Sequence, residues 1–125
     1  MTLEDVLEEI RARLEERIKR QLSGLQGLVV RPVYNSMMPL HVELSLTPEV
    51  FVFMFLKDGV VELRHGYSAL ADVRIESDAQ ALRNLFQNPD AELFKDLERQ
   101  NRITITALTK RGREAEAYIR RYLSG

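Results

Sequence analysis

The sequence predicts an α+β fold, in which a single, mostly antiparallel sheet has helices beside it. Two patterns predict this fold. Apolar residues recur every three or four positions at the start of the chain and in its second half, which is typical of helices with one buried face. Runs of alternating apolar and polar residues lie between these helices and are typical of half-buried strands. The chain of 125 residues has the length of one domain, 1–125.

The first predicted helix covers residues 2–22. Thr2 is a suitable N-cap, and Ser23 and Gly24 end the helix. Its apolar stripe consists of Leu3, Val6, Leu7, Ile10, Leu14, Ile18 and Leu22.

Residues 24–41 are apolar but irregular in pattern, and Pro32 and Pro39 interrupt them. A solvated linker would not carry so much apolar surface, so we expect this segment to lie against the body of the domain. It allows a short strand over 28–30.

Three strands are predicted next, over residues 42–46, 50–56 and 60–64. The middle run is apolar at every position, so both of its faces should be covered. Asp58-Gly59 predicts a two-residue hairpin turn before the third strand, because a type I′ turn needs positive φ at both central positions.

This turn sets an expected register for the hairpin. With a two-residue loop, Met54 pairs with Leu63, and the Phe residues of the middle strand face Glu62 and Arg64. The Val, Met and Leu face then belongs to the core, while the Phe face needs a cover. We expect that cover to be a second copy of the chain, which gives a homodimer with the interface residues Phe51, Phe53, Phe55 and Arg64. The alternative is that residues 25–40 fold over the same face.

The second half of the chain alternates helices and strands. A strand is expected over 72–76, two short helices follow on either side of Asn88-Pro89, and another strand covers 102–108. The last helix starts at about Gly112 and buries Ala115, Tyr118, Ile119 and Tyr122.

Composition limits the classes of function. Cys is absent, so disulfides, thiolate nucleophiles and cysteine metal sites are excluded. The net charge of −1 does not favour nucleic acid. The N-terminus does not have the pattern of a signal peptide, and the longest apolar run is too short to span a bilayer. We therefore expect a cytoplasmic protein with at most transient membrane contact.

Catalytic patterns are missing from the sequence. His41 and His65 lie on different predicted elements, and no metal-binding, nucleotide-binding or nucleophile motif occurs. Asp72 opens a partly buried strand, and we interpret it as a carboxylate that receives backbone hydrogen bonds. We expect no catalytic residue, no metal and no cofactor, and therefore not an enzyme.

Several stretches resemble the sterol carrier protein type-two domain, a non-specific lipid-transfer fold. They are Phe55–Gly59, Ala71–Ile75, Ser77-Asp78, Asn88-Pro89, Arg102–Thr106 and Gly112, in this order and spacing. The resemblance covers about residues 53–123. It departs from the family at Ala107, where a Gly is usual, and in the charged closing helix, and both departures argue against a roomy sterol tunnel.

The resemblance implies a five-stranded, largely antiparallel sheet with helices packed on one face. It also implies a non-catalytic carrier whose apolar cavity, between sheet and helices, holds a fatty acid, acyl-CoA or sterol. The alternative is a small homodimeric interaction module in which the same residues fill the pocket and no ligand binds. The residues expected to line the cavity are Met54, Leu56, Leu63, Leu82, Leu85, Phe86, Leu93, Phe94, Leu97, Tyr118 and Tyr122.

Overall fold

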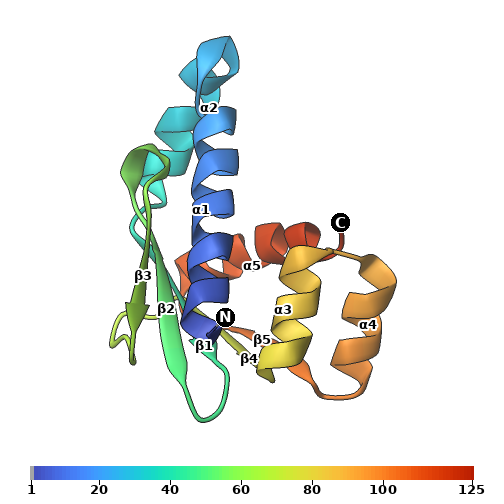
Figure 1. Cartoon of the computed structure of the whole chain (residues 1–125). Helices are drawn as coiled ribbons and strands as arrows, with labels where there is room; N and C mark the ends of the chain where they lie inside the picture. The colour runs from blue at the N-terminus through green and yellow to red at the C-terminus, as the bar shows by residue number, and fades with distance from the viewer. Residues whose placement is uncertain (1) are drawn as a thin grey trace.

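The computed structural model describes residues 2–125. Its five strands form one sheet in the order β3-β2-β1-β4-β5 (Figure 1). β1 and β4 are parallel, and every other neighbouring pair is antiparallel, which confirms the expected α+β class. The strands are β1 (Leu40–Ser45), β2 (Val50–Phe55), β3 (Val61–His65), β4 (Val73–Ser77) and β5 (Ile103–Ala107).

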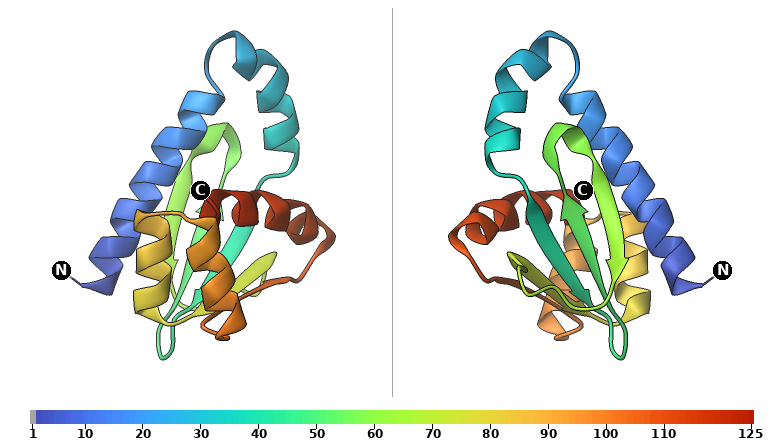
Figure 2. Two further views of the ribbon diagram at one scale, coloured as in Figure 1. Left: turned by 90° about the vertical axis from the view of Figure 1, so that its right-hand side faces the viewer. Right: turned by 90° about the vertical axis from the view of Figure 1, so that its left-hand side faces the viewer.

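The helices pack on one side of this sheet, and Figure 2 shows the sheet from both sides. Helices α1 and α2 form an antiparallel arm whose apex projects beyond the strands (Figures 1 and 2). Their bounds are α1 (Leu3–Gln21), α2 (Gly24–Ser36), α3 (Ala79–Gln87), α4 (Ala91–Arg99) and α5 (Lys110–Leu123), with a short 3-10 turn, η1 (Lys57–Gly59).

The inner face of the sheet, which the helices cover, is apolar on all five strands. Phe51 and Phe53 of the central strand β2 are each only 1% exposed and belong to the main hydrophobic cluster. Leu44 and Val42 of β1 lie directly opposite them. The inner face is completed by Leu40, Val61, Val73, Ile75, Ile103 and Ile105.

The β2–β3 turn is one residue longer than the sequence pattern predicts. Asp58 and Gly59 both have positive φ, 61° and 83°, as the dipeptide requires. Lys57 joins them in the connection, and the Leu56 N–H closes it by donating to the Val60 carbonyl at 2.8 Å. The additional residue shifts the register of β3 by one position.

The expected exposed Phe face is therefore wrong. Phe53 pairs with Leu63 and Phe55 with Val61, so the Phe residues share a face with apolar partners beneath the helices. Arg64 points to the opposite, outer face, where its side chain is largely exposed. Because Phe51 and Phe53 are already buried within one chain, they are not available to form a homodimer interface.

Residues 24–36 form helix α2, so the expected irregular segment and the short strand over 28–30 are also wrong. Gly24 has φ +68°, which lets the chain turn sharply out of α1. Pro32 lies inside α2, where it lacks an amide donor for the carbonyl four residues earlier.

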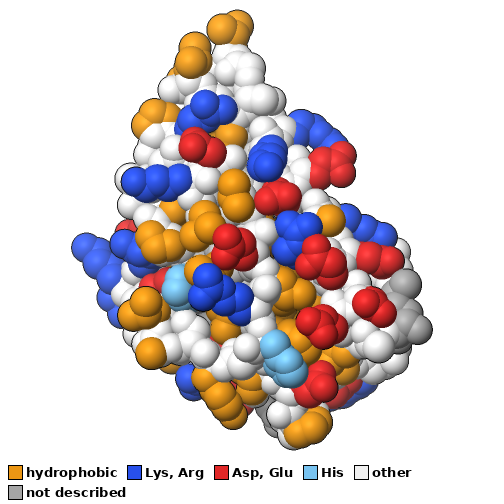
Figure 3. Space-filling model, turned by 60° about the vertical axis from the view of Figure 1, so that its left-hand side comes forward, with side chains coloured by type: hydrophobic (Ala, Val, Ile, Leu, Met, Phe, Trp, Pro, Cys, Tyr) orange, Lys and Arg blue, Asp and Glu red, His pale blue; other side chains and the backbone are white. Residues whose placement is uncertain are grey.

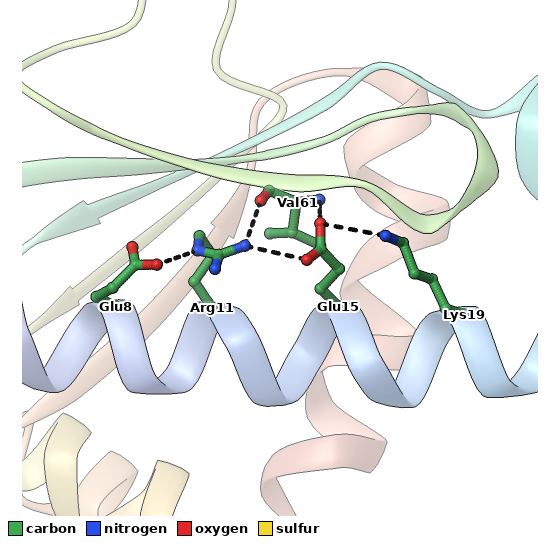
Figure 4. A network of polar contacts seen from close by, with 5 residues as sticks. All are labelled: Glu8, Arg11, Glu15, Lys19 and Val61. Carbon is green, nitrogen blue, oxygen red and sulfur yellow. Dashed lines mark hydrogen bonds and ion pairs between the residues drawn. The ribbon is translucent and has the colours of Figure 1, made fainter.

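Helix α1 protects the exposed edge of the sheet through polar contacts with β3 (Figure 4). Arg11 donates to the Val61 carbonyl at 2.9 Å, and the Val61 N–H donates to Glu15 at 3.0 Å. Glu8 and Lys19 extend this network along α1, with ion pairs of 2.6 Å to Arg11 and 3.9 Å to Glu15. An edge strand whose backbone groups are satisfied in this way does not offer them to another chain.

Asp72 joins three separate parts of the fold. Its buried carboxylate accepts the His41 N–H at 3.0 Å and the Thr109 hydroxyl at 2.7 Å. Its backbone N–H donates to the His41 carbonyl, and its carbonyl accepts from Leu108, both at 2.8 Å. Gly112 packs so closely on it that an added Cβ would lie 1.9 Å from the Asp72 carbonyl oxygen. The carboxylate does receive a backbone hydrogen bond, as we interpreted it from the sequence.

We predict that the Glu15 contact makes the fold sensitive to acid. The Val61 N–H, together with Arg11, holds the pKa of Glu15 below its ordinary value. A lowered pKa in the folded state stabilises the fold above the ordinary carboxyl range, and this contribution is lost as the pH falls through the folded-state pKa. Glu15→Gln should lower the urea midpoint at neutral pH and reduce its decline on acidification. Glu16→Gln, an exposed neighbour on α1, is the control, and equal profiles for the two variants would contradict the prediction.

We also predict that Asp72→Ala destabilises the domain. The change leaves the His41 N–H and the Thr109 hydroxyl without their acceptor, which should cost about 2–3 kcal/mol in the free energy of unfolding. Urea denaturation followed by circular dichroism measures this loss. Glu76→Ala, at an exposed position of the adjoining strand β4, should change the stability by less than about 0.5 kcal/mol. An Asp72→Ala protein as stable as this control would show that the hydrogen bonds carry no net free energy.

Candidate functional site

The candidate site is the seam between the inner face of the sheet and the helices that cover it. Eight of the residues expected to line a cavity lie in the hydrophobic cluster of this seam. The structure thus brings most of the predicted set together. These eight residues are Leu63, Leu82, Leu85, Phe86, Leu93, Phe94, Leu97 and Tyr122.

Three expected lining residues lie outside this cluster. Met54 is on the outer face, where it pairs with His41 and Glu62, because the register differs by one residue from the expected one. Leu56 follows β2 just before the turn. Tyr118 is 62% exposed on α5, with the Arg121 guanidinium 5.8 Å from its ring centre.

The half of the seam beneath α3 and α4, here called the α3 half, is filled by side chains. Leu82 and Leu85 are almost completely buried, and the rings of Phe86 and Tyr122 lie 5.9 Å apart. Two open surface hollows in residues 2–125 lie outside both halves of the seam, at the α1–α2 corner and on the surface of α4. The α3 half is therefore core in this structure.

The other half, here called the hairpin half, lies where α1 and α2 meet the β2–β3 hairpin. Its apolar side chains pack against the cluster but are only partly buried. Two contacts place these elements together: Asn35 of α2 exchanges hydrogen bonds of 3.1 and 2.9 Å with Asp58, and Ile18 lies beside Gly59. The partly buried residues of the hairpin half are Leu14, Ile18, Tyr34, Met37, Phe55 and Leu63.

Tyr34 gives the hairpin half its distinctive polar group. Its hydroxyl is buried and has no hydrogen-bond partner among the described residues. Burial raises the pKa of Tyr34 to about 12, because the phenolate cannot be solvated there. Buried hydroxyls in folded proteins are normally paired, so the unpaired Tyr34 hydroxyl is an exception within this core. We did not single out Tyr34 from the sequence, because residues 24–41 read as an irregular segment.

The two histidines are in separate structural contacts. The His41 Nδ1 lies 3.0 Å from the Ser68 hydroxyl oxygen, and the His65 ring stacks on Phe51 with ring centres 4.6 Å apart. Within residues 2–125, no three His, Asp or Glu side chains gather closely enough to hold a metal ion. None of the described helices combines the length and the apolar character that crossing a membrane requires.

We predict that Tyr34 ionises only at very alkaline pH. Because its pKa is raised in the folded state, the neutral phenol stabilises the fold below the ordinary value of 10.0, and this contribution is lost as the pH rises towards about 12. Ultraviolet titration should show one phenol that titrates near pH 12, and Tyr34→Phe should lack that step.

The same variant tests whether the Tyr34 hydroxyl is unpaired. Tyr34→Phe removes no hydrogen bond within the chain, so it should leave the free energy of unfolding unchanged or raise it by about 1 kcal/mol. Tyr118→Phe, at an exposed position, is the control and should keep the step near pH 12. A marked loss of stability in Tyr34→Phe would show that the hydroxyl has a partner.

Comparison with known proteins identifies the fold from its structure. No protein-family model matches the sequence, and no curated protein sequence matches it. Among solved structures, UbiJ-SCP2, a ubiquinone synthesis protein, is 11% identical with a TM-score of 0.60, and the match covers 93% of this chain and 90% of that one.

A second similar structure is the solution NMR structure of palmitated SCP2L2 from Aedes aegypti. It is 17% identical with a TM-score of 0.52, and the match covers 100% of this chain and 96% of that one. Both similar structures are SCP2 proteins that match nearly along their whole length. The chain therefore has the fold of the sterol carrier protein type-two domain, as the resemblance in its sequence implies.

Proposed function

We propose that the chain binds a long-chain amphiphile, such as a fatty acid, acyl-CoA or sterol, without catalysing a reaction. The observation that carries this proposal is the orphaned Tyr34 hydroxyl beside the partly buried apolar residues of the hairpin half. Such a combination suits a molecule with a polar end and an apolar chain. The fold supports the same function, since one of its structural neighbours is palmitated SCP2L2.

The physical requirements of such a site are modest. Each methylene that leaves water for an apolar environment gains about 0.8 kcal/mol, so a carrier needs only a wall that excludes water. Side chains such as Ile18, Met37 and Phe55 supply apolar surface that is incompletely covered in the chain itself. We propose that the alkyl chain lies against these residues and that the Tyr34 hydroxyl donates to the polar end.

In this proposal the α3 half is closed core and does not contact the ligand. Leu85 is completely buried and Leu82 nearly so, and a ligand could replace them only by displacing the core. The expected lining residues of α3 and α4, together with Tyr122, therefore hold the sheet and helices together, while Leu63 belongs to the hairpin half that meets the ligand.

The second candidate function is an interaction module that binds no small molecule. The close packing of the α3 half favours this candidate, because it shows that part of the seam is filled by the chain's own side chains. The two functions differ in a directly measurable way, since only the first includes saturable uptake of a lipid.

We predict saturable binding of palmitate that depends on Tyr34. A fluorescent fatty-acid displacement assay measures the affinity, and Tyr34→Phe should raise the dissociation constant about tenfold through loss of a hydrogen bond to a carboxylate. Tyr118→Phe should bind like the wild type. If the wild type takes up no fatty acid, acyl-CoA or sterol, the carrier proposal fails and the filled module replaces it.

A further inference from the structure

Helix α2 exposes its apolar side instead of burying it. Leu25 is 85% exposed, Leu28 and Val29 are each 74% exposed, and Val33 is 63% exposed. These positions follow helical spacing and form one stripe along the solvent side of the helix. Together with Pro32 they are called here the apolar face of α2. Figure 3 shows hydrophobic side chains at the apex of the molecule, and below them Lys and Arg side chains interspersed with Asp and Glu.

The inward side of α2 contains Tyr34 and, next to it, residues that are small or polar. At Gly27 an added Cβ would lie 2.0 Å from the Leu22 carbonyl oxygen, so the helix rests directly on the end of α1. The Arg31 guanidinium donates to the same Leu22 carbonyl at 3.0 Å. The two hydrogen bonds between Asn35 and Asp58 fasten the other end of α2 to the hairpin. The outward direction of the apolar face is therefore fixed by contacts at both ends of the helix.

The segment of chain that contains this face has a positive net charge, although the whole chain has a net charge of −1. Residues 17–42 contain Arg17, Lys19, Arg20 and Arg31 and no acidic residue. Glu16 pairs with Arg20 and Glu15 with Lys19, yet the segment stays net positive when both acids are counted. Exposed apolar side chains beside Lys and Arg are typical of helices that lie in the interface of an anionic bilayer.

We propose that the apolar face of α2 docks on the surface of an anionic lipid bilayer. Leu25, Leu28 and Val29 enter the boundary between head groups and acyl chains. Arg20 and the neighbouring cations of α1 contact the lipid phosphates. This inference does not depend on a ligand in the seam, because it concerns the opposite side of α2.

A second copy of the chain fits this surface less well. A symmetric dimer through α2 would bring two copies of the same positively charged segment together with no acidic residue between 17 and 42 to compensate. Like charges at the rim of an interface oppose association, whereas an anionic bilayer attracts both the charges and the apolar side chains. We therefore expect the protein to be monomeric in sedimentation equilibrium without lipid.

Vesicle co-sedimentation tests the proposal. The protein should pellet with vesicles of phosphatidylcholine mixed with phosphatidylglycerol, more weakly with phosphatidylcholine alone, and more weakly at high salt. Leu28→Glu should lower the affinity at least about tenfold, since a leucine leaves the apolar phase. The matched control is Leu70→Glu, because Leu70 is 72% exposed in a different loop, and it should bind like the wild type. Both positions are exposed, so circular dichroism should show unchanged folding.

The charge contribution has its own pair of variants. Arg20→Gln should weaken binding to the anionic vesicles about fivefold, because each basic residue near such a surface contributes about 1 kcal/mol. Arg99→Gln is the control, since Arg99 is also an exposed arginine that pairs with an acidic neighbour on its own helix. An equal effect of the two substitutions would contradict the assigned role of the α1–α2 arm.

The absence of tryptophan from the chain allows a direct measurement of insertion. Leu28→Trp should give fluorescence that shifts to shorter wavelength with anionic vesicles and is quenched by brominated acyl chains. Leu70→Trp should show neither effect. Failure of the wild type to bind anionic vesicles overturns the proposal, and so does a lipid-free dimer that Leu28→Glu dissociates. Palmitate binding in vesicle-free solution is measured separately. The proposal of ligand binding in the seam and the proposal of bilayer docking through α2 are therefore tested independently of each other.

Discussion

The buried carboxylate of Asp72 holds the fold at the point where its topology is least local. β1 and β4 are parallel neighbours, although β2 and β3 lie between them in the chain, so residues 66–72 must return across the sheet (Figure 2). Asp72 ends this return and binds the start of β1 through His41 and the N-cap of α5 through Thr109. One residue thus connects β1, the start of β4 and the N-terminus of α5 by hydrogen bonds. The inner face that the helices cover extends across this junction.

That inner face is used in two different ways along its length. Beneath α3 and α4 the side chains interdigitate, and the core is closed. Near the hairpin, α1 is held to the edge strand by polar contacts between Arg11, Glu15 and Val61, which leave less apolar packing between them. The partly buried side chains and the orphaned Tyr34 hydroxyl occur at this end. The proposed site for an amphiphile and the well-packed core thus lie on the same face of one sheet.

The α1–α2 arm connects the two proposals physically. Tyr34 is on the inward side of α2 and contributes to the hairpin half, while Leu28 and Val29 are on its outward side. The same short helix thus separates the proposed ligand from the proposed bilayer. In the two proposals taken together, a lipid that leaves the bilayer at α2 would pass this one helix to reach the apolar residues of the hairpin half. The rigid attachment of α2 at Leu22 and Asp58 keeps the two sides distinct.

The sequence by itself determined the elements whose periodicity is local. The helix over residues 2–22, the strands and the α+β class follow from apolar spacing. The role of Asp72 as an acceptor of backbone hydrogen bonds followed from its place, as a short polar residue directly before a buried run. The tertiary structure alone decided the register of the β2–β3 hairpin, where Lys57 joins the turn and moves the Phe residues from the expected surface into the core. It also decided that residues 24–36 form helix α2 across Pro32, and which side of that helix meets the protein. Side chains distant in the sequence determine both outcomes, through contacts that no local pattern contains.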